Sequence, residues 1–98
     1  MYTIAQTENY KKWFSKLKNN LAKFAIVARI ERVAEGNFGD SKFIGDGVFE
    51  LRVDVGKGYR VYFMNQNGKI ILLLIGGDKS TQSQDIVKAK EMAKEINQ

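Results

Sequence analysis

The strongest constraint on the fold is a change of hydrophobic period in the second half of the chain. From Phe49 to Val55, and again from Tyr59 to Phe63, every second residue is apolar, as in strands that bury one face. The segment Ile70–Ile75 is apolar at every position, which predicts an interior strand covered on both faces. An Asn-Gly pair within Asn65–Gly68 predicts a hairpin between the last two strands.

The other elements follow from helical spacing, weak alternation or loop-forming composition. In chain order they are a strand at Tyr2–Gln6, a helix from Thr7 to about Lys18, a helix from about Leu21 to Glu35, a loop at Gly36–Gly47 and a helix from about Gln82 to Ile96. The order β-α-α-β-β-β-α predicts a single α+β domain over residues 1–98. We expect a four-stranded, mainly antiparallel sheet packed on an α-hairpin, with the last helix covering part of the other face.

Composition narrows the chemistry that is available. The chain has no cysteine and no histidine, so thiolate metal sites, disulfides and the usual acid or base at neutral pH are excluded. We therefore expect no cofactor and no metal, and any catalysis must use carboxylate, Lys, Arg or Tyr side chains. The net charge of +5 favours nucleic acid or an acidic partner.

Targeting signals are not expected in this sequence. The N-terminal stretch MYTIAQTENYKKW lacks the basic segment followed by an apolar run that marks a signal peptide. The longest apolar run has six residues, Ile70–Ile75, which is far too short to span a bilayer. The sequence thus predicts a cytoplasmic protein without a membrane partner.

The two alternating strands also predict a pair of opposed arginines. Matching their apolar faces sets Leu51 opposite Val61, because a shift by one residue would turn every side chain to the wrong face. The same register places Arg52 opposite Arg60. Like charges directly opposite one another destabilise a sheet by some tenths of a kcal/mol, so a purely structural sheet seldom carries such a pair.

Two interpretations of this pair remain open from the residues alone. In the first, Arg52 and Arg60 are solvated strand residues neutralised by Glu50 and Asp54. In the second, the arginines lie on an open sheet face as two guanidinium forks that bind phosphate. Glu50 and Tyr62, which the same register places opposite each other, would then add groups for proton transfer.

The motifs GVFELRVDVGKGYRVYF and IILLLIGGDKSTQSQDIVKAKEMAKE resemble the RelE/ParE toxin superfamily, in particular its addiction-module killer (HigB-like) branch. The resemblance covers nearly the whole chain. It implies a RelE-like fold, a small sheet packed on an α-hairpin. It also implies a type II toxin that is neutralised by a helix-turn-helix antitoxin from the same operon and that contacts DNA only through this antitoxin.

The resemblance leaves three activities open. RelE- and HigB-type members cleave mRNA, which implies a metal-independent, ribosome-dependent mRNA endonuclease with mRNA and the ribosome as partners. ParE-type members inhibit DNA gyrase without catalysis. A phage-derived copy that binds its antitoxin but has lost its toxicity is the third alternative.

The residues that carry over from the superfamily are Arg52 of ELR, Arg60 of GYR and Lys79 of GGDK. RelE proper has lysines on the strand before the turn, whereas Glu50 stands at that position here. Candidate bases are Glu50 and a neutral Lys79, and candidate acids are Tyr62 and Lys79. A carboxylate beside two arginines should have a lowered pKa and be a weak base.

The last helix is expected to make a weak contact with the sheet. Its apolar stripe consists mostly of small residues, namely Ile86, Ala89, Ala93 and Ile96, whose burial is worth only a few kcal/mol at about 25 cal/mol per Å². A partner helix could compete for such a groove. We therefore expect the antitoxin to bind near the two arginines or the last helix.

Overall fold

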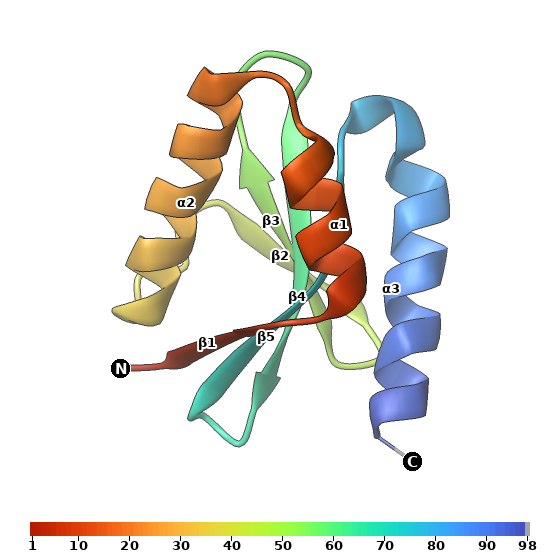
Figure 1. Cartoon of the computed structure of the whole chain (residues 1–98). Coiled ribbons are helices and arrows are strands. Elements are labelled where there is room, and N and C mark those ends of the chain that lie inside the picture. The colour runs from red at the N-terminus through yellow and green to blue at the C-terminus, as the bar shows by residue number, and fades with distance from the viewer. Residues whose placement is uncertain (98) are drawn as a thin grey trace.

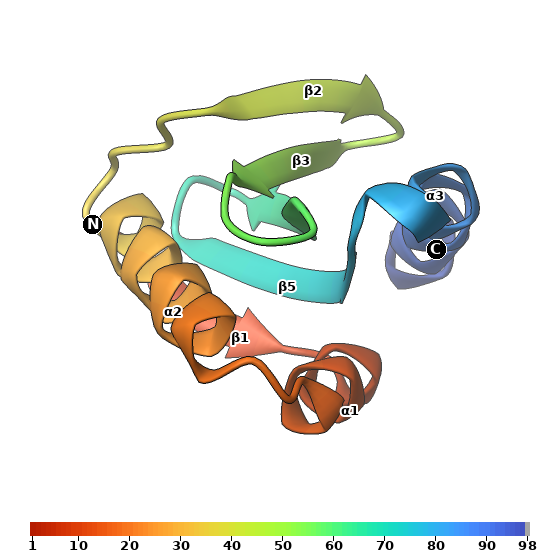
Figure 2. The same ribbon diagram turned by 90° about the horizontal axis from the view of Figure 1, so that it is seen from above.

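In the computed structural model, which describes residues 1–97, a five-stranded sheet lies at the centre of the molecule between helices on both faces (Figures 1 and 2). In chain order the elements are β1 (Thr3–Gln6), α1 (Glu8–Lys16), α2 (Asn20–Ala34), β2 (Ser41–Gly45), β3 (Val48–Val53), β4 (Tyr59–Gln66), β5 (Ile70–Gly77), the 3₁₀ helix η1 (Lys79–Thr81) and α3 (Gln82–Ile96). The strand order is β1-β5-β4-β3-β2, with only β1 and β5 parallel among the pairs of this sheet. The predicted α+β class is confirmed.

The prediction of four strands was wrong by one. Strand β2 lies inside Gly36–Gly47, which glycine-rich composition had assigned to a loop, and it pairs with β3 at the edge of the sheet. The β2–β3 pairing shifts register between Phe43 and Gly45, and this bulge accommodates Gly45. Asp46 and Gly47 follow with φ values of 53° and 78°, which is the Asp-Gly hairpin turn.

Alternation along the strands divides the core between the two faces of the sheet. Leu51, Val61 and Phe63 belong to the larger cluster, which also contains buried residues of α1 and α2. Tyr62 and Met64 belong to a smaller cluster with Ala89 and Ala93 of α3. Apolar alternation in the sequence predicts these faces correctly, and the small contact of α3 is as expected.

The two N-terminal helices are antiparallel, as predicted, and each begins with a side-chain cap (Figure 1). The Thr7 hydroxyl oxygen accepts from the Tyr10 amide at 3.0 Å and donates to the Leu74 carbonyl at 2.6 Å. Asn19 caps α2 by accepting from the Ala22 amide at 3.1 Å. Thr7 thus both starts α1 and fixes it to β5.

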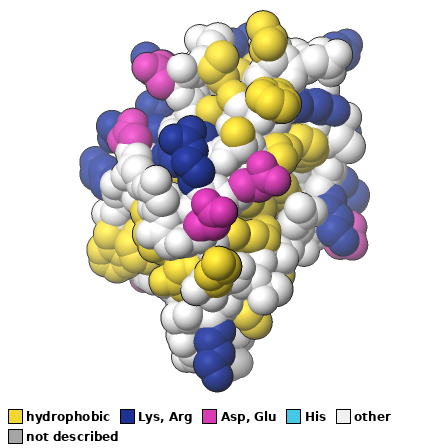
Figure 3. Space-filling view, turned by 90° about the vertical axis from the view of Figure 1, so that its left-hand side faces the viewer, with side chains coloured by type: hydrophobic (Ala, Val, Ile, Leu, Met, Phe, Trp, Pro, Cys, Tyr) yellow, Lys and Arg dark blue, Asp and Glu magenta, His cyan; other side chains and the backbone are white. Residues whose placement is uncertain are grey.

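Helix α2 is apolar on its outer face as well as on the face that packs against the sheet. Leu21 and Phe24 are about three-quarters exposed, and Val27 is nearly half exposed. Figure 3, which views this side of the molecule, shows hydrophobic side chains interspersed with charged ones. Despite this apolar surface, no helix within residues 1–97 has the length and hydropathy needed to cross a membrane.

Candidate functional site

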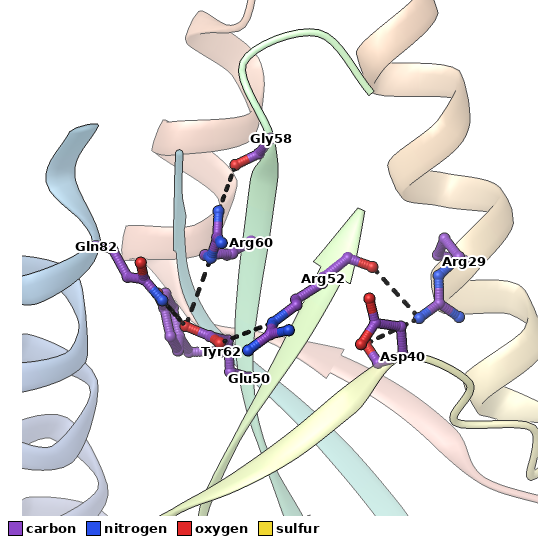
Figure 4. A network of polar contacts seen from close by, with 8 residues as sticks. All are labelled: Arg29, Asp40, Glu50, Arg52, Gly58, Arg60, Tyr62 and Gln82. Atoms are coloured by element: carbon purple, nitrogen blue, oxygen red, sulfur yellow. Dashed lines mark hydrogen bonds and ion pairs between the residues drawn. The ribbon is translucent and has the colours of Figure 1, made fainter. Parts of the chain in front are cut away.

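The β3–β4 hairpin brings the predicted residues together on the face of the sheet that α3 covers. Arg52 lies opposite Arg60, and Glu50 opposite Tyr62, in the register deduced from the sequence. The four side chains belong to the even-numbered positions of these strands and share one face. Figure 4 shows them next to Gln82, the first residue of α3.

Glu50 is the centre of the resulting polar network (Figure 4). Its side chain is 1% exposed. One carboxylate oxygen, Oε2, accepts from the Tyr62 hydroxyl at 3.0 Å and from Gln82 Nε2 at 2.9 Å. The other, Oε1, accepts from Arg52 Nε at 3.4 Å, while Arg60 Nε lies 3.7 Å from Oε2. A single buried carboxylate therefore separates and holds two guanidinium groups.

The environment of Glu50 keeps it ionised. Burial raises its pKa, but the hydrogen bonds from Gln82, Tyr62 and Arg52, together with the charge of Arg60, outweigh burial and bring the pKa below its ordinary value. A buried carboxylate with a lowered pKa and four partners is a poor base. The sequence predicted the direction of this shift, and the structure adds that Glu50 positions the two arginines.

The expectation that both arginines lie on an open face was wrong for Arg60. The Arg60 residue is only 9% exposed, and its Nη1 donates to the Gly58 carbonyl at 2.8 Å. Its Nε has no hydrogen-bond partner among the described residues. The start of α3 lies to one side of the hairpin, where Gln82 donates to the Glu50 carboxylate (Figure 4). Arg52 keeps 41% of its side chain exposed and is the more accessible of the two cations.

Lys79 reaches the same end of the sheet from η1. It is exposed, and the atoms of its stem lie along Gly58, where an added Cβ would be 3.3 Å from Lys79 Cγ and Cε. Gly58 has a φ of +75°, a conformation that favours glycine. The Gly58 carbonyl also accepts from Arg60, so Lys79 and Arg60 share this glycine as a neighbour.

Tyr62 does not face solvent, as a proton donor to a bound substrate would. It is fully buried, and its hydroxyl donates to Glu50. Burial, followed by the charge and hydrogen bond of Glu50, raises the pKa of Tyr62 above its ordinary value. Of the two candidate acids, Lys79 is the one with an exposed proton.

Sequence reasoning missed the residues that shape the site from outside the hairpin. Gln82 had no signal, since polar residues are common at the start of a helix. Gly76 and Gly77 did have one, because two glycines in an apolar strand mark a close approach. A Cβ on Gly76 would collide with the Trp13 ring of α1, and a Cβ on Gly77 with the Asp85 carboxylate of α3. Because these two positions lack a Cβ, α1 can pack closely on one face of β5 and α3 on the other.

The site combines cations with one shielded anion. Arg52 is partly exposed and Arg60 is buried, and both contact Glu50. Lys79 is exposed, and its stem lies along Gly58. Within residues 1–97 there is no group of three or more His, Cys, Asp or Glu side chains placed to hold a metal ion. Such an arrangement can bind a phosphate and stabilise charge that develops on its oxygens.

Comparison with known sequences gives two matches along most of the chain. The model of the family described as phage-derived protein Gp49-like (DUF891) matches residues 12–96. An uncharacterized protein of Haemophilus influenzae is 57% identical over 93 residues, which are 95% of this chain and 94% of the relative.

Comparison with solved structures identifies the same fold in a bacterial toxin. A mutant of the E. coli toxin RelE in the free state superposes with a TM-score of 0.77 at 17% identity, over 93% of this chain and 96% of the other. A chain of the intact E. coli RelBE toxin–antitoxin complex gives a TM-score of 0.65 at 16% identity, over 80% and 96%. The resemblance to the RelE/ParE superfamily is thus confirmed in the fold.

Proposed function

Because the chain belongs to the family of phage-derived Gp49-like proteins and has the fold of RelE, we propose that it is the toxin of a toxin–antitoxin pair. We further propose that it acts as an mRNA endonuclease on the ribosome. The observation that carries this proposal is the cross-strand pair of Arg52 and Arg60 held around the buried Glu50. Two cations directly opposite on a sheet repel each other, and the single carboxylate between them balances only one of the two charges, which favours a role in binding an anion.

The chemistry follows from the placement of these cations. In RNA cleavage the 2′-hydroxyl loses its proton and attacks the adjacent phosphorus, and the bond to the 5′-oxygen breaks as that oxygen takes up a proton. Arg52, which contacts Glu50 through Nε and keeps 41% of its side chain exposed, would bind the non-bridging oxygens and stabilise their growing charge. Arg60 adds fixed positive charge from the interior. Guanidinium groups thus supply the charge stabilisation that other nucleases obtain from a metal ion.

Proton transfer is assigned to the exposed lysine. Lys79 would protonate the leaving 5′-oxygen. Its stem lies along Gly58, whose carbonyl accepts a hydrogen bond from Arg60, and this shared neighbour supports the assignment. Glu50 is not placed as the base, because both its oxygens are buried and already accept hydrogen bonds. The set of proton-transfer groups on this chain is therefore incomplete, which favours an enzyme whose site is completed by the ribosome.

The proposed partner in the cell is a helix-turn-helix antitoxin from the same operon. The fold match to a chain of the RelBE toxin–antitoxin complex supports an antitoxin. An exposed cationic site must be silenced, and α3, which packs on the sheet through buried Ala89 and Ala93, offers a contact that a partner helix could replace.

Mapping of RNA ends after induction of the chain in growing cells tests this proposal. Growth arrest with discrete cuts inside translated codons, found by primer extension, is the expected result. Growth arrest without cuts, together with inhibition of purified gyrase in a supercoiling assay, would assign the chain to the gyrase inhibitors. No arrest at all would identify an inactive, phage-derived homologue.

A further inference from the structure

A second cationic feature lies next to the arginine pair. A cavity of about 450 Å³ opens between the α1–α2 loop and the β3–β4 loop. Its lining contains three lysines, one asparagine and one aspartate, namely Lys16, Lys18, Lys57, Asn19 and Asp78. None of these residues belongs to the set proposed above for catalysis.

Positive charge predominates in this cavity. The three lysines are all exposed. The single aspartate, Asp78, is engaged with η1, where its Oδ1 accepts from the Ser80 amide at 2.8 Å and the Ser80 hydroxyl at 2.6 Å. These hydrogen bonds to Ser80 and then the charge of Lys57 lower the pKa of Asp78. The cavity therefore has three lysine charges and only one carboxylate, whose Oδ1 already accepts hydrogen bonds from Ser80. This excess of positive charge can attract an anion.

The shape of the cavity is fixed by the two loops that form it. Gly56 has a φ of +53°, and a Cβ there would lie 3.6 Å from Asn19 Nδ2 and 3.7 Å from the Tyr59 ring, so the loops are in close approach. Asn19 uses its Oδ1 to cap α2, while its Nδ2 faces the other loop. The first turn of α2 has no acidic residue, which leaves the positive end of the helix dipole uncompensated.

The cavity is adjacent to the candidate catalytic site along the β3–β4 loop. Lys57 lines the cavity. The carbonyl of the next residue, Gly58, accepts a hydrogen bond from Arg60, and the Lys79 side chain packs along Gly58. Lys57 is therefore at most about 10 Å along the chain from Arg60. A polyanion that places one phosphate at Arg52 and Lys79 can extend over Gly58 into the lysines of the cavity.

We propose that this cavity is a subsite for the ribose-phosphate backbone of single-stranded RNA beside the phosphate that is cleaved. The proposal rests on the endonuclease function proposed above. Proteins that bind single strands track the backbone with a positively charged groove, and contacts to phosphate carry no sequence information. Tyr59, the aromatic ring at this cavity, is buried and offers no face for base stacking, so the subsite should hold the strand without reading its sequence.

Salt-dependent binding of a short 2′-O-methyl RNA, which cannot be cleaved through its 2′-oxygen, tests the subsite on the full chain. The cavity variant combines Lys16→Gln, Lys18→Gln and Lys57→Gln. The control variant removes the same charge at exposed basic residues of α2, the β4–β5 turn and α3, with Arg32→Gln, Lys69→Gln and Lys94→Gln. Each phosphate contact contributes about 0.7 to the slope of log K against log salt for a single strand, so the cavity variant should lose about two units of slope while the control loses little.

Equal slopes for the cavity and control variants would overturn the subsite. A cavity variant that keeps its RNA affinity but loses affinity for a poly-glutamate peptide would overturn it too, and would assign the cavity to an acidic protein partner. Either result leaves the endonuclease proposal standing if the unmodified chain cuts mRNA in cells and an Arg52→Gln variant does not. Circular dichroism of both variants confirms that they are folded before binding is compared.

Discussion

Arg52 and Arg60 are direct cross-strand partners in β3 and β4, and both guanidinium groups form ion pairs with the single buried carboxylate of Glu50. The two arginines are nevertheless unlike, because Arg52 is partly exposed whereas Arg60 is buried and bonded to the Gly58 carbonyl. This asymmetry assigns contact with the substrate to Arg52 and a supporting position to Arg60. It also separates the effects that mutation of each should have.

Arg52→Gln should abolish toxicity and leave the fold intact. The lost guanidinium would bind charge that develops in the transition state, and removal of one such donor lowers the rate by about 10²- to 10³-fold. Because the side chain is 41% exposed, the change in the free energy of unfolding should stay within about 1 kcal/mol. Cleavage rates and urea denaturation measure the two effects. A loss of stability as large as that of a core mutant such as Leu51→Asp would show that Arg52 is structural.

Arg60→Ala should reduce both activity and stability. It leaves the buried Glu50 with one cation fewer and removes the bond to Gly58, and breaking a buried ion pair costs about 3 kcal/mol. The free energy of unfolding from urea titration should therefore fall several times further than for Arg52→Gln. Similar stability of the two variants would contradict the asymmetry described above.

The stability of the chain should depend on the ionisation of Glu50. A carboxyl group whose pKa is lowered on folding stabilises the fold above its unfolded pKa, close to 4.5 for Glu, and this contribution is lost as the pH falls through the folded value. The wild type should thus be more stable than Glu50→Gln near pH 7, and the difference should shrink below pH 4.5. Asp78 also has a lowered pKa, but it titrates in both proteins. A difference that is constant with pH would exclude this role for Glu50.

Gly76→Ala should destabilise the fold through α1. The added methyl group collides with the Trp13 ring, and overpacking of this kind costs about 1–3 kcal/mol. A double variant that also carries Trp13→Leu should recover part of the loss, because the smaller side chain leaves room. Thermal unfolding of the single and double variants gives the coupling, and strictly additive losses would show that the two residues do not compete for space.

Activity should not depend on a metal ion bound to the toxin. Arginine and lysine side chains supply the positive charge of the site, so dialysis of the purified chain against EDTA, followed by removal of the chelator, should leave its cleavage rate unchanged. The ribosomes are added afterwards, so that their own magnesium is not disturbed. Loss of activity that zinc or manganese restores would refute the assignment of charge stabilisation to Arg52 and Arg60.

The hairpin could be predicted because two local rules agree there. Apolar alternation fixed which side chains share a face, and the register of Leu51 with Val61 placed the arginines opposite one another. Strand β2 was missed although Asp46-Gly47 carries a hairpin signal, since the glycines around it also suit a loop. The burial of Arg60 depends on long-range packing, which alternation along the strands does not predict. Gly76 and Gly77 mark a close approach, but nothing in the sequence identifies Trp13 and Asp85 as the side chains that approach them.

Cleavage by purified components tests the central claim most directly. Ribosomes programmed with one mRNA are incubated with the wild type or with Arg52→Gln, and primer extension locates the ends. We predict cuts at the codon in the ribosomal A site with the wild type, none with the variant and none on the same mRNA without ribosomes. Equal cutting by the two proteins, or no cutting by a wild-type chain that arrests growth, would contradict the account.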